Sequence, residues 1–346
     1  MSKKKSRKKA VFFGELLLGL AAHRHERFVQ AKELEVRYTG AEANAAVSAS
    51  HFGLECFVVS AVPQNDIGSA CVNFIRQYGI NTDHVLRTGN RLGIFYLETG
   101  ASQRPSKVIY DRSGSAITEI RKADFDWKTI FHGKQWFHFS GTAPALGSNV
   151  AEAVADACEA ARREGLTVSC DINFRRKLWS PERAKEVMTG LMKNVDVLIG
   201  NEEDAANVFG IEASGVDVTS GTLDRDKYRQ VAGKLHESFD LRVAAITLRE
   251  SLSASDNNWS AMLYDGAEFH FSRRYRIRVV DRVGAGDSFS GALIYSLISG
   301  RPAQEALEFA VAASCLKHTV HGDFNLVTKD EVERLLAGDA SGRVQR

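Results

Sequence analysis

The chain has 346 residues, of which 44% are hydrophobic and 25% are charged, and its formal net charge is +2. This length supports a sizeable hydrophobic core without disulfides, and the composition excludes collagen, a coiled coil and wholesale disorder. Six of the 45 basic residues lie in the first nine positions, which leaves 39 basic against 43 acidic residues in the rest of the chain. Such a body is not expected to bind nucleic acid. No run of about 18 uncharged apolar residues occurs, so we expect no membrane-spanning helix.

The chain begins with a basic segment that leads into an apolar stretch. We expect residues 1–9 to form a disordered tail and residues 10–13 to form a buried strand. The alternative is a secretory leader, because secretory leaders also have an apolar run after basic residues. Gly14 and Glu15 interrupt the run, which favours a strand followed by a turn. The five cysteines form no C-x-x-C pair, so they predict core residues in a reducing, cytoplasmic compartment and no cysteine metal site.

Short apolar runs alternate with longer amphipathic segments along the chain. This alternation predicts an α/β fold, in which a doubly wound, mainly parallel sheet carries helices on both faces. The runs are rich in β-branched residues, as expected for strands buried on both faces. The expected strands lie near residues 10–13, 57–62, 135–139, 167–172, 195–199 and 243–248, and the expected helices near 41–52, 66–78, 148–165, 181–193, 202–209 and 224–239.

Two segments, from about 16–39 and 92–112, depart from this alternation. Polar and apolar residues alternate within them, and no helix lies between their strands. They predict a small antiparallel β lid outside the main sheet, with an exposed face that pairs with a second copy of the chain. With the lid inserted, residues 10–337 are expected to form one domain and residues 338–346 a tail.

The segment DRVGAGDSFSGAL, residues 281–293, joins a strand-like stretch to a helix. Gly284, Ala285 and Gly286 let several backbone amides point at one spot beside the helix N-terminus, which creates an anion site. Asp287 places a carboxylate next to this site, where it would repel phosphate. We interpret Asp287 as a general base beside a transferring phosphoryl group. The alternative is an acid that only favours the start of the helix. No P-loop motif occurs.

Polar side chains follow several predicted strands at the points where the strands end. The carboxyl ends of the strands form the ligand crevice of a doubly wound sheet, so these side chains are expected to meet there. Their convergence predicts a site for a small polar substrate. The residues are Glu15, Ser140, Asp171, Asn173, Arg175, Asn201 and Thr247.

Residues 281–293 resemble the C-terminal signature of the ribokinase-like (PfkB) sugar kinases, and residues 39–53, TGAEANAAVSASHFG, resemble the N-terminal signature of that family. Segments 108–116, 140–146 and 171–184 look most like those of 2-keto-3-deoxygluconate kinases. The resemblance implies a ribokinase-like fold and ATP-dependent phosphorylation of a terminal hydroxyl, first of all C6 of 2-keto-3-deoxygluconate. The alternatives are a fructokinase or another sugar kinase of the family, and a non-catalytic regulator that binds sugar or nucleotide.

The resemblance also implies roles for individual residues. Asp287 would be the base, and Gly284, Ala285, Gly286 and Asp287 would supply the anion hole. Arg175 would grip a sugar carboxylate or, as in fructokinases, a nucleotide phosphate. Asn201 and Asp204 would hold Mg²⁺, or would simply favour the start of a helix. The sugar would contact Glu15, Gly40, Asn44, Tyr110, Arg112, Arg175 and Asp287, and ATP would contact Asn173, Arg175, Asn201, Thr247, Arg249, Gly284 and Gly286.

Some positions depart from the family pattern. Arg282 stands where threonine is usual, and residues 247–263 lack the glycines of the nucleotide-site turn. We expect residues 247–263 to form a longer turn. His318 and His321 are interpreted as loop or surface residues, with a place beside the adenine as the alternative.

Overall fold

The computed structural model describes residues 7–213 and 225–339. Residues 1–6 of the predicted N-terminal tail and residues 340–346 of the predicted C-terminal tail therefore lie outside the described residues. The first strand begins at Lys9, one residue earlier than expected, and it lies inside the main sheet. The division into one domain and two tails stays a prediction. Within the described ranges no helix is long and apolar enough to cross a membrane.

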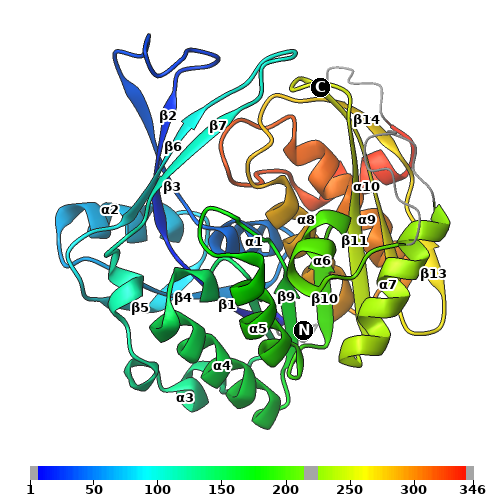
Figure 1. Cartoon of the computed structure of the whole chain (residues 1–346), viewed down its shortest axis with the longest axis horizontal. Helices are drawn as coiled ribbons and strands as arrows, with labels where there is room; N and C mark the ends of the chain where they lie inside the picture. The colour runs from blue at the N-terminus through cyan, green and yellow to red at the C-terminus, as the bar shows by residue number, and fades with distance from the viewer. Residues whose placement is uncertain (1–6, 214–224, 340–346) are drawn as a thin grey trace, which may run out of the picture.

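The main sheet has ten strands and is parallel except around β12 (Figure 1). The prediction of a mainly parallel α/β sheet is confirmed. Strand β14 (Tyr275–Arg278) pairs with β12 beside the end of the sheet. The order of the others is β13 (Phe269–Phe271), β12 (Asp256–Tyr264), β11 (Val243–Ser251), β10 (Val197–Gly200), β9 (Thr167–Asp171), β8 (Trp136–Ser140), β1 (Lys9–Phe13), β4 (Glu55–Val62) and β5 (Asn81–Arg87).

Helices cover both faces of the sheet, and alternate side chains of each strand reach opposite cores. In β1, Val11 and Phe13 belong to one buried cluster, whereas Ala10 and Phe12 belong to the other. The first core is closed by α3 (Trp127–Phe131), α4 (Ser148–Arg163), α5 (Pro181–Met192), α6 (Glu202–Phe209) and α7 (Arg225–Phe239). The second is closed by α1 (Ala41–His51), α2 (Asp66–Arg76), α8 (Ala285–Ile298), α9 (Ala303–Lys317) and α10 (Lys329–Leu336).

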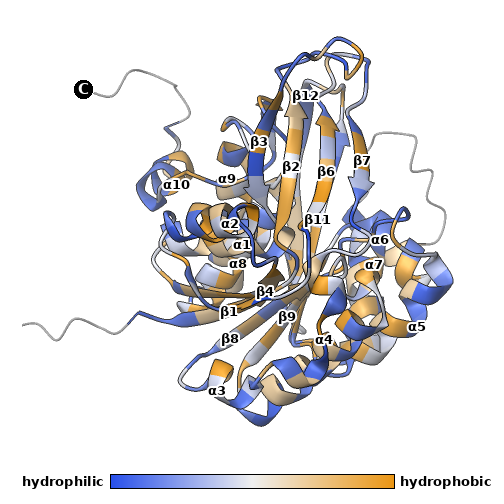
Figure 2. Cartoon of the chain, turned by 90° about the vertical axis from the view of Figure 1, so that its left-hand side faces the viewer, coloured by the Kyte–Doolittle hydropathy of each residue, from blue (hydrophilic) through white to orange (hydrophobic). Residues whose placement is uncertain are grey.

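A separate four-stranded sheet forms the lid, as the sequence predicts. Its order is β3 (Leu34–Thr39), β2 (Leu17–Ala22), β6 (Gly93–Glu98) and β7 (Lys107–Asp111). The two outer pairs are antiparallel, but the central pair of β2 and β6 is parallel. Figure 1 shows the lid strands apart from the main sheet, and Figure 2 shows apolar residues along β2 and β6.

The prediction of a long turn over residues 247–263 was wrong. Most of this segment is a β-hairpin, in which β11 continues to Ser251 and β12 returns from Asp256. The turn between them is tight, since the Leu252 amide donates to the Asp256 carbonyl at 3.1 Å. Side chains alternate between the two faces of β12, and the face that carries Trp259 packs into the core. This packing stabilises the hairpin.

Candidate active site

A cavity of about 440 Å³ lies between the lid and the carboxyl ends of the parallel strands. Lid side chains such as Phe95 and Val108 line one side, and the start of α8 lines another. The volume suits a small polar ligand with part of a nucleotide. Ser140, which was also expected at the site, does not line this cavity, whereas Asp171 does. The structure brings to it all the residues to which the resemblance gave a role: Glu15, Gly40, Asn44, Tyr110, Arg112, Asn173, Arg175, Asn201, Asp204, Thr247, Arg249, Gly284, Ala285, Gly286 and Asp287.

Gly284 shapes the start of α8. It has φ 76°, a left-handed conformation that favours glycine. A Cβ at this position would lie 1.9 Å from the carbonyl oxygen of Asp323. No side chain caps the helix. The Ala285 amide donates to the Arg282 carbonyl at 3.3 Å, and the next amides of the first turn are open to an external acceptor. Together with the helix dipole, they suit an anionic ligand at the edge of the cavity, and the anion hole stays a prediction.

Asp287 lies in the first turn of α8, half-buried, and lines the cavity. The Asn44 amide donates from Nδ2 to Oδ2 of Asp287 at 2.7 Å. Thr39 donates from Oγ1 to the Asn44 amide oxygen at 2.8 Å, which fixes the orientation of that amide. Burial raises the pKa of Asp287 to about 7, the Asn44 hydrogen bond opposes this rise, and the nearby Asp171 adds to it. A carboxyl with this pKa can take up a proton near neutral pH.

Three further carboxyl groups that line the cavity, those of Glu42, Asp171 and Asp204, have a raised pKa. Burial, followed by the proximity of Asp204, raises the pKa of Asp171 to about 7. Burial also raises the pKa of Glu42 to about 7 and that of Asp204 to about 6. Glu42 accepts hydrogen bonds from the Ser140 amide and hydroxyl at 3.0 and 2.6 Å. Sequence analysis did not assign a role to Glu42, although it lies inside the TGAEANAA segment.

Asn201 and Asp204 interlock at the start of α6. The Asp204 amide donates to the Asn201 side-chain oxygen at 2.8 Å, and Asn201 Nδ2 donates to Asp204 Oδ2 at 3.0 Å. The amide of Phe174 donates to the other Asp204 oxygen at 3.3 Å. Both residues therefore stabilise the start of α6, and both also line the cavity, so the Mg²⁺ role stays a prediction. Within the described residues no group of three or more His, Cys, Asp or Glu side chains is arranged to hold a metal.

Three arginines place positive charge on the cavity wall. Arg175 donates to the Phe174 carbonyl, Arg282 donates to the Ala254 carbonyl, and Arg249 lies over the ring of Trp259. Desolvation, followed by the neighbouring Arg282, lowers the pKa of Arg249. In the described part of the chain none of these three guanidinium groups hydrogen-bonds to a carboxylate. They are therefore available to an anionic ligand.

A buried ion pair connects the lid to the end of β1. Arg112 donates from Nε to Glu15 Oε2 at 2.6 Å, and Ser115 donates to Glu15 Oε1 at 2.5 Å. The centre of the Tyr110 ring lies 5.6 Å from Cζ of the Arg112 guanidinium. Gly40 approaches the Glu15 carbonyl so closely that a Cβ there would lie 2.2 Å from the oxygen.

The two C-terminal histidines have different surroundings. His318 is fully buried next to Trp259, so the surface interpretation was wrong for it. Burial lowers the pKa of His318 to about 4, and a ring nitrogen lies 2.7 Å from the Ser314 carbonyl. His321 is more than half exposed, as expected. Neither histidine lines the cavity.

The fold and the site define a class of phosphoryl-transfer protein. Residues 7–329 match the family model described as pfkB family carbohydrate kinase. The chain therefore belongs to the pfkB family of carbohydrate kinases.

Individual relatives extend this similarity. A 2-dehydro-3-deoxygalactonokinase from Haloferax volcanii is 33% identical over 332 residues, which cover 96% of this chain and 98% of the relative. The crystal structure of a 2-dehydro-3-deoxygluconokinase from Thermotoga maritima is 46% identical, with a TM-score of 0.92 over 96% of this chain and 99% of its own. A fructokinase with bound ATP from Xylella fastidiosa shares the fold at 19% identity, with a TM-score of 0.78 over 96% of this chain and 99% of its own. These similarities favour the prediction of a 2-keto-3-deoxy sugar acid kinase over the fructokinase and regulator alternatives.

Proposed function

We propose that this chain transfers the γ-phosphoryl group of ATP to the terminal hydroxyl of a 2-keto-3-deoxy sugar acid. The first candidate substrate is 2-keto-3-deoxygluconate, the same compound as the 2-dehydro-3-deoxygluconate in the name of the Thermotoga relative. The observation that carries the proposal is the carboxylate of Asp287, which lies in the same cavity as the uncapped start of α8. A binding protein gains nothing from a carboxylate beside phosphate, whereas a kinase requires a base there.

Asp287 acts as the general base. It accepts the proton of the sugar hydroxyl as the hydroxyl oxygen bonds to the γ-phosphorus, and the bond from phosphorus to the β–γ bridging oxygen breaks to release ADP. The amides of Gly284, Ala285, Gly286 and Asp287 stabilise the charge on the phosphoryl oxygens. Asn44 orients the carboxylate and holds its pKa near neutrality.

The triphosphate lies along the cationic wall formed by Arg175, Arg249 and Arg282. This placement favours the phosphate role over the sugar role for Arg175, because Arg175 and Arg282 are both close enough to Arg249 to lower its pKa. Thr247 and Asn173, which line the same part of the cavity, complete the nucleotide contacts.

Mg²⁺ fits the acidic side of the cavity. Asp204 and Asn201 would hold it there, beside the desolvated carboxyl of Asp171, whose raised pKa a cation would lower. Mg²⁺ commonly keeps several waters and takes only one or two protein carboxylates in phosphate sites, which agrees with the small donor set. When bound, it supplies charge neutralisation for the phosphates.

The sugar acid lies under the lid. Arg112 uses its Nε and one Nη for Glu15, which leaves further N–H groups of the guanidinium for a substrate carboxylate. Gly40 and Asn44 border the same space, and Tyr110 covers it from the lid. 2-Keto-3-deoxygalactonate is the second candidate, since it carries the same carboxylate and terminal hydroxyl and the Haloferax relative is named for it.

A panel of acceptors tests the substrate. We expect kcat/KM to be highest for 2-keto-3-deoxygluconate or 2-keto-3-deoxygalactonate, and lower for fructose, ribose and 2-ketogluconate. The Asp287→Asn variant is expected to lower kcat by roughly 10²–10⁴ while the dissociation constant of the sugar acid stays nearly unchanged. Asp83→Asn, which alters an exposed acid on β5, is the matched control. Preference for a neutral sugar contradicts the acid-substrate assignment, and near-normal turnover by Asp287→Asn contradicts the base.

We also propose that the outer face of the lid pairs with a second copy of the chain. Val36 and Ile109 on its two edge strands are 56% and 53% exposed, and apolar side chains on an open sheet favour association. Light scattering is expected to give a dimer that Val36→Lys weakens; a monomeric wild type contradicts the pairing. The free cysteines fit a reducing, cytoplasmic location.

A further inference from the structure

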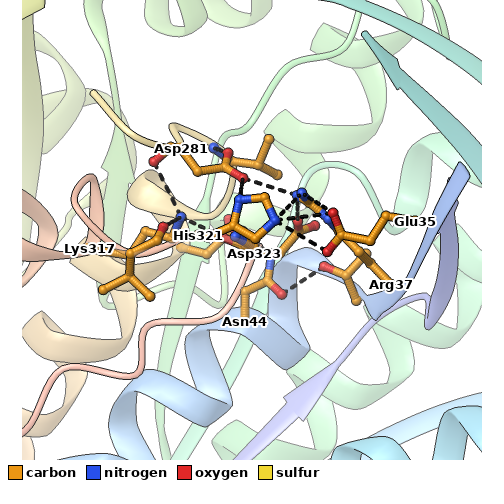
Figure 3. A network of polar contacts seen from close by, with 12 residues as sticks. Glu35, Arg37, Asn44, Asp281, Lys317, His321 and Asp323 are labelled. Carbon is orange, nitrogen blue, oxygen red and sulfur yellow. Dashed lines mark hydrogen bonds and ion pairs between the residues drawn. The ribbon is translucent and has the colours of Figure 1, made fainter. Parts of the chain in front are cut away.

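Lys317, the last residue of α9, is fully buried and lies behind the anion hole (Figure 3). Its ammonium donates to the carbonyl oxygen of Gly322 at 2.7 Å and to those of Asp281 and Val320 at 3.4 Å. A neutral amine has only two N–H groups, whereas carbonyl oxygens can only accept. Three carbonyl partners therefore match a protonated, positively charged Lys317.

The surroundings of Lys317 are balanced in charge. The carboxylates of Asp281 and Asp323 both accept from Arg37 Nη1, at 3.0 and 3.3 Å. Burial lowers the pKa of Lys317, while the two carboxylates raise it and Arg37 lowers it further. The cluster thus holds two anions and two cations. Glu35 and His321 lie at its exposed rim, where both contact Arg37. Removing the ammonium leaves one excess negative charge next to the site that binds phosphate.

The backbone segments that Lys317 joins are those that shape the anion hole. The Asp281 carboxylate accepts from the amides of Val283 and Gly322, both at 3.1 Å, so it connects the 281–284 segment to the 320–323 segment. Gly284 lies directly against the carbonyl of Asp323. The ammonium therefore holds together the two segments whose contact fixes the position of the Gly284 amide.

We propose that Lys317 is a resident monovalent cation: its ammonium fills a cage of main-chain oxygens, positions the anion hole, and makes phosphoryl transfer independent of dissolved monovalent cations. Carbonyl oxygens are ligands for hard cations, and they also receive hydrogen bonds from an ammonium ion. The same cage, emptied of the side chain, is therefore expected to take up NH₄⁺ or K⁺. Lys317 is a positioning residue, because it acts through the backbone of the anion hole and does not line the cavity.

The test compares the wild type with Lys317→Met, which keeps the chain length and removes the charge. Lys234→Met is the control, since Lys234 donates to one carbonyl, that of Glu212, at the surface. Each protein is assayed in choline chloride and in NH₄Cl or KCl at equal ionic strength. The readouts are kcat, the KM for ATP, and calorimetric binding of a non-hydrolysable ATP analogue. The inference rests on the proposed kinase activity only for the turnover readouts. Analogue binding needs no sugar, so a wrong sugar assignment is told apart from a wrong assignment of Lys317.

In choline we expect Lys317→Met to lose about tenfold to a hundredfold in kcat/KM for ATP, the effect of leaving buried acceptors unpaired. NH₄⁺ or K⁺ is expected to restore most of this loss and to strengthen analogue binding, whereas the wild type and Lys234→Met change by less than about twofold. Three results overturn the proposal: a wild type that requires K⁺ or NH₄⁺, a Lys317→Met variant with normal activity in choline, or a folded variant that neither ion restores. Should Lys317→Met lack a cooperative thermal transition in choline, NH₄⁺ is expected to restore that transition, and a failure to do so also overturns the proposal.

Discussion

The hydrogen bond from Asn44 to Asp287 sets the pH at which the proposed base becomes available. Replacing Asn44 with leucine removes the donor at 2.7 Å and keeps a side chain of similar size. The carboxylate then loses the hydrogen bond that opposes the effect of burial on its pKa. The base should therefore become protonated at a higher pH than in the wild type.

The size of the shift follows from the type of bond. A hydrogen bond to a charged group contributes about 1.5–3 kcal/mol, and one pKa unit corresponds to about 1.4 kcal/mol. The pKa of Asp287, raised by burial to about 7 in the wild type, should rise by about one to two units in Asn44→Leu. The sign is fixed because the bond is made to the ionised oxygen, so its loss disfavours ionisation. The carboxyl of Asp171 couples to this titration, so the measured value belongs to the pair.

The assay is the pH profile of kcat/KM for the sugar acid, which reports ionisations of the free enzyme. Asn44 also borders the sugar, so its loss lowers the whole profile, but a uniform loss of binding does not move the acid limb along the pH axis. Thr39→Val is the matched control, because it removes the hydroxyl that orients the Asn44 amide and keeps the bond to Asp287. Its acid limb should move by less than about half a unit. An unchanged acid limb in Asn44→Leu refutes the assignment of Asp287 as the titrating base.

Three further predictions concern the same site. Gly284→Ala places a Cβ 1.9 Å from the Asp323 carbonyl at φ 76°, so we expect kcat to fall by about tenfold or more as the anion hole shifts; calorimetry of an ATP analogue should show weaker binding, and unchanged binding contradicts the prediction. Arg112→Ala should raise KM for the sugar acid more than for fructose in steady-state kinetics, although it also leaves Glu15 unpaired; an equal effect on both sugars rejects a carboxylate contact. Asp287→Asn should raise the free energy of unfolding by about 1–3 kcal/mol at pH 8 and by less at pH 5. The reason is that a carboxyl with a raised pKa destabilises the folded chain once it ionises. Urea unfolding at both pH values measures the gain, and equal gains exclude the ionisation as the cause.

Local patterns were sufficient to predict the framework of the site. The sequence predicts helix 202–209 at the bounds that α6 has in the structure. It also predicts a helix near 181–193, where α5 lies with Ser180 accepting a hydrogen bond from the Arg183 amide at its start. Parallel strands present their carboxyl ends at one edge, so polar residues after successive strands were expected to converge, and the cavity contains them except Ser140, which hydrogen-bonds to the cavity residue Glu42.

Long-range pairing lies beyond such patterns. Arg37 and Asp323 are separated by 286 positions along the chain, and neither lies in a motif that would predict their contact. Lys317 occupies the end of an otherwise ordinary helix, and its burial depends on how α9 meets the loop after it. The hairpin over residues 247–263 was missed because the strand was expected to end at residue 248 and the segment after it was interpreted as a longer turn, whereas Trp259 in that segment packs into the core.

The carboxyls of the cavity and the cluster behind it have opposite electrostatic designs. Asp171, Asp204 and Asp287 have pKa values raised by burial, so their ionised forms lower the stability of the folded chain in the absence of ligand. In the cluster around Lys317, by contrast, Arg37 pairs with both Asp281 and Asp323, and the Lys317 ammonium donates to backbone carbonyls. The carboxyls of Asp171, Asp204 and Asp287 face the cavity, where a cation can pair with them or a proton can be transferred to them. That separation gives a rigid anion hole beside carboxyls that are ready to change their protonation state.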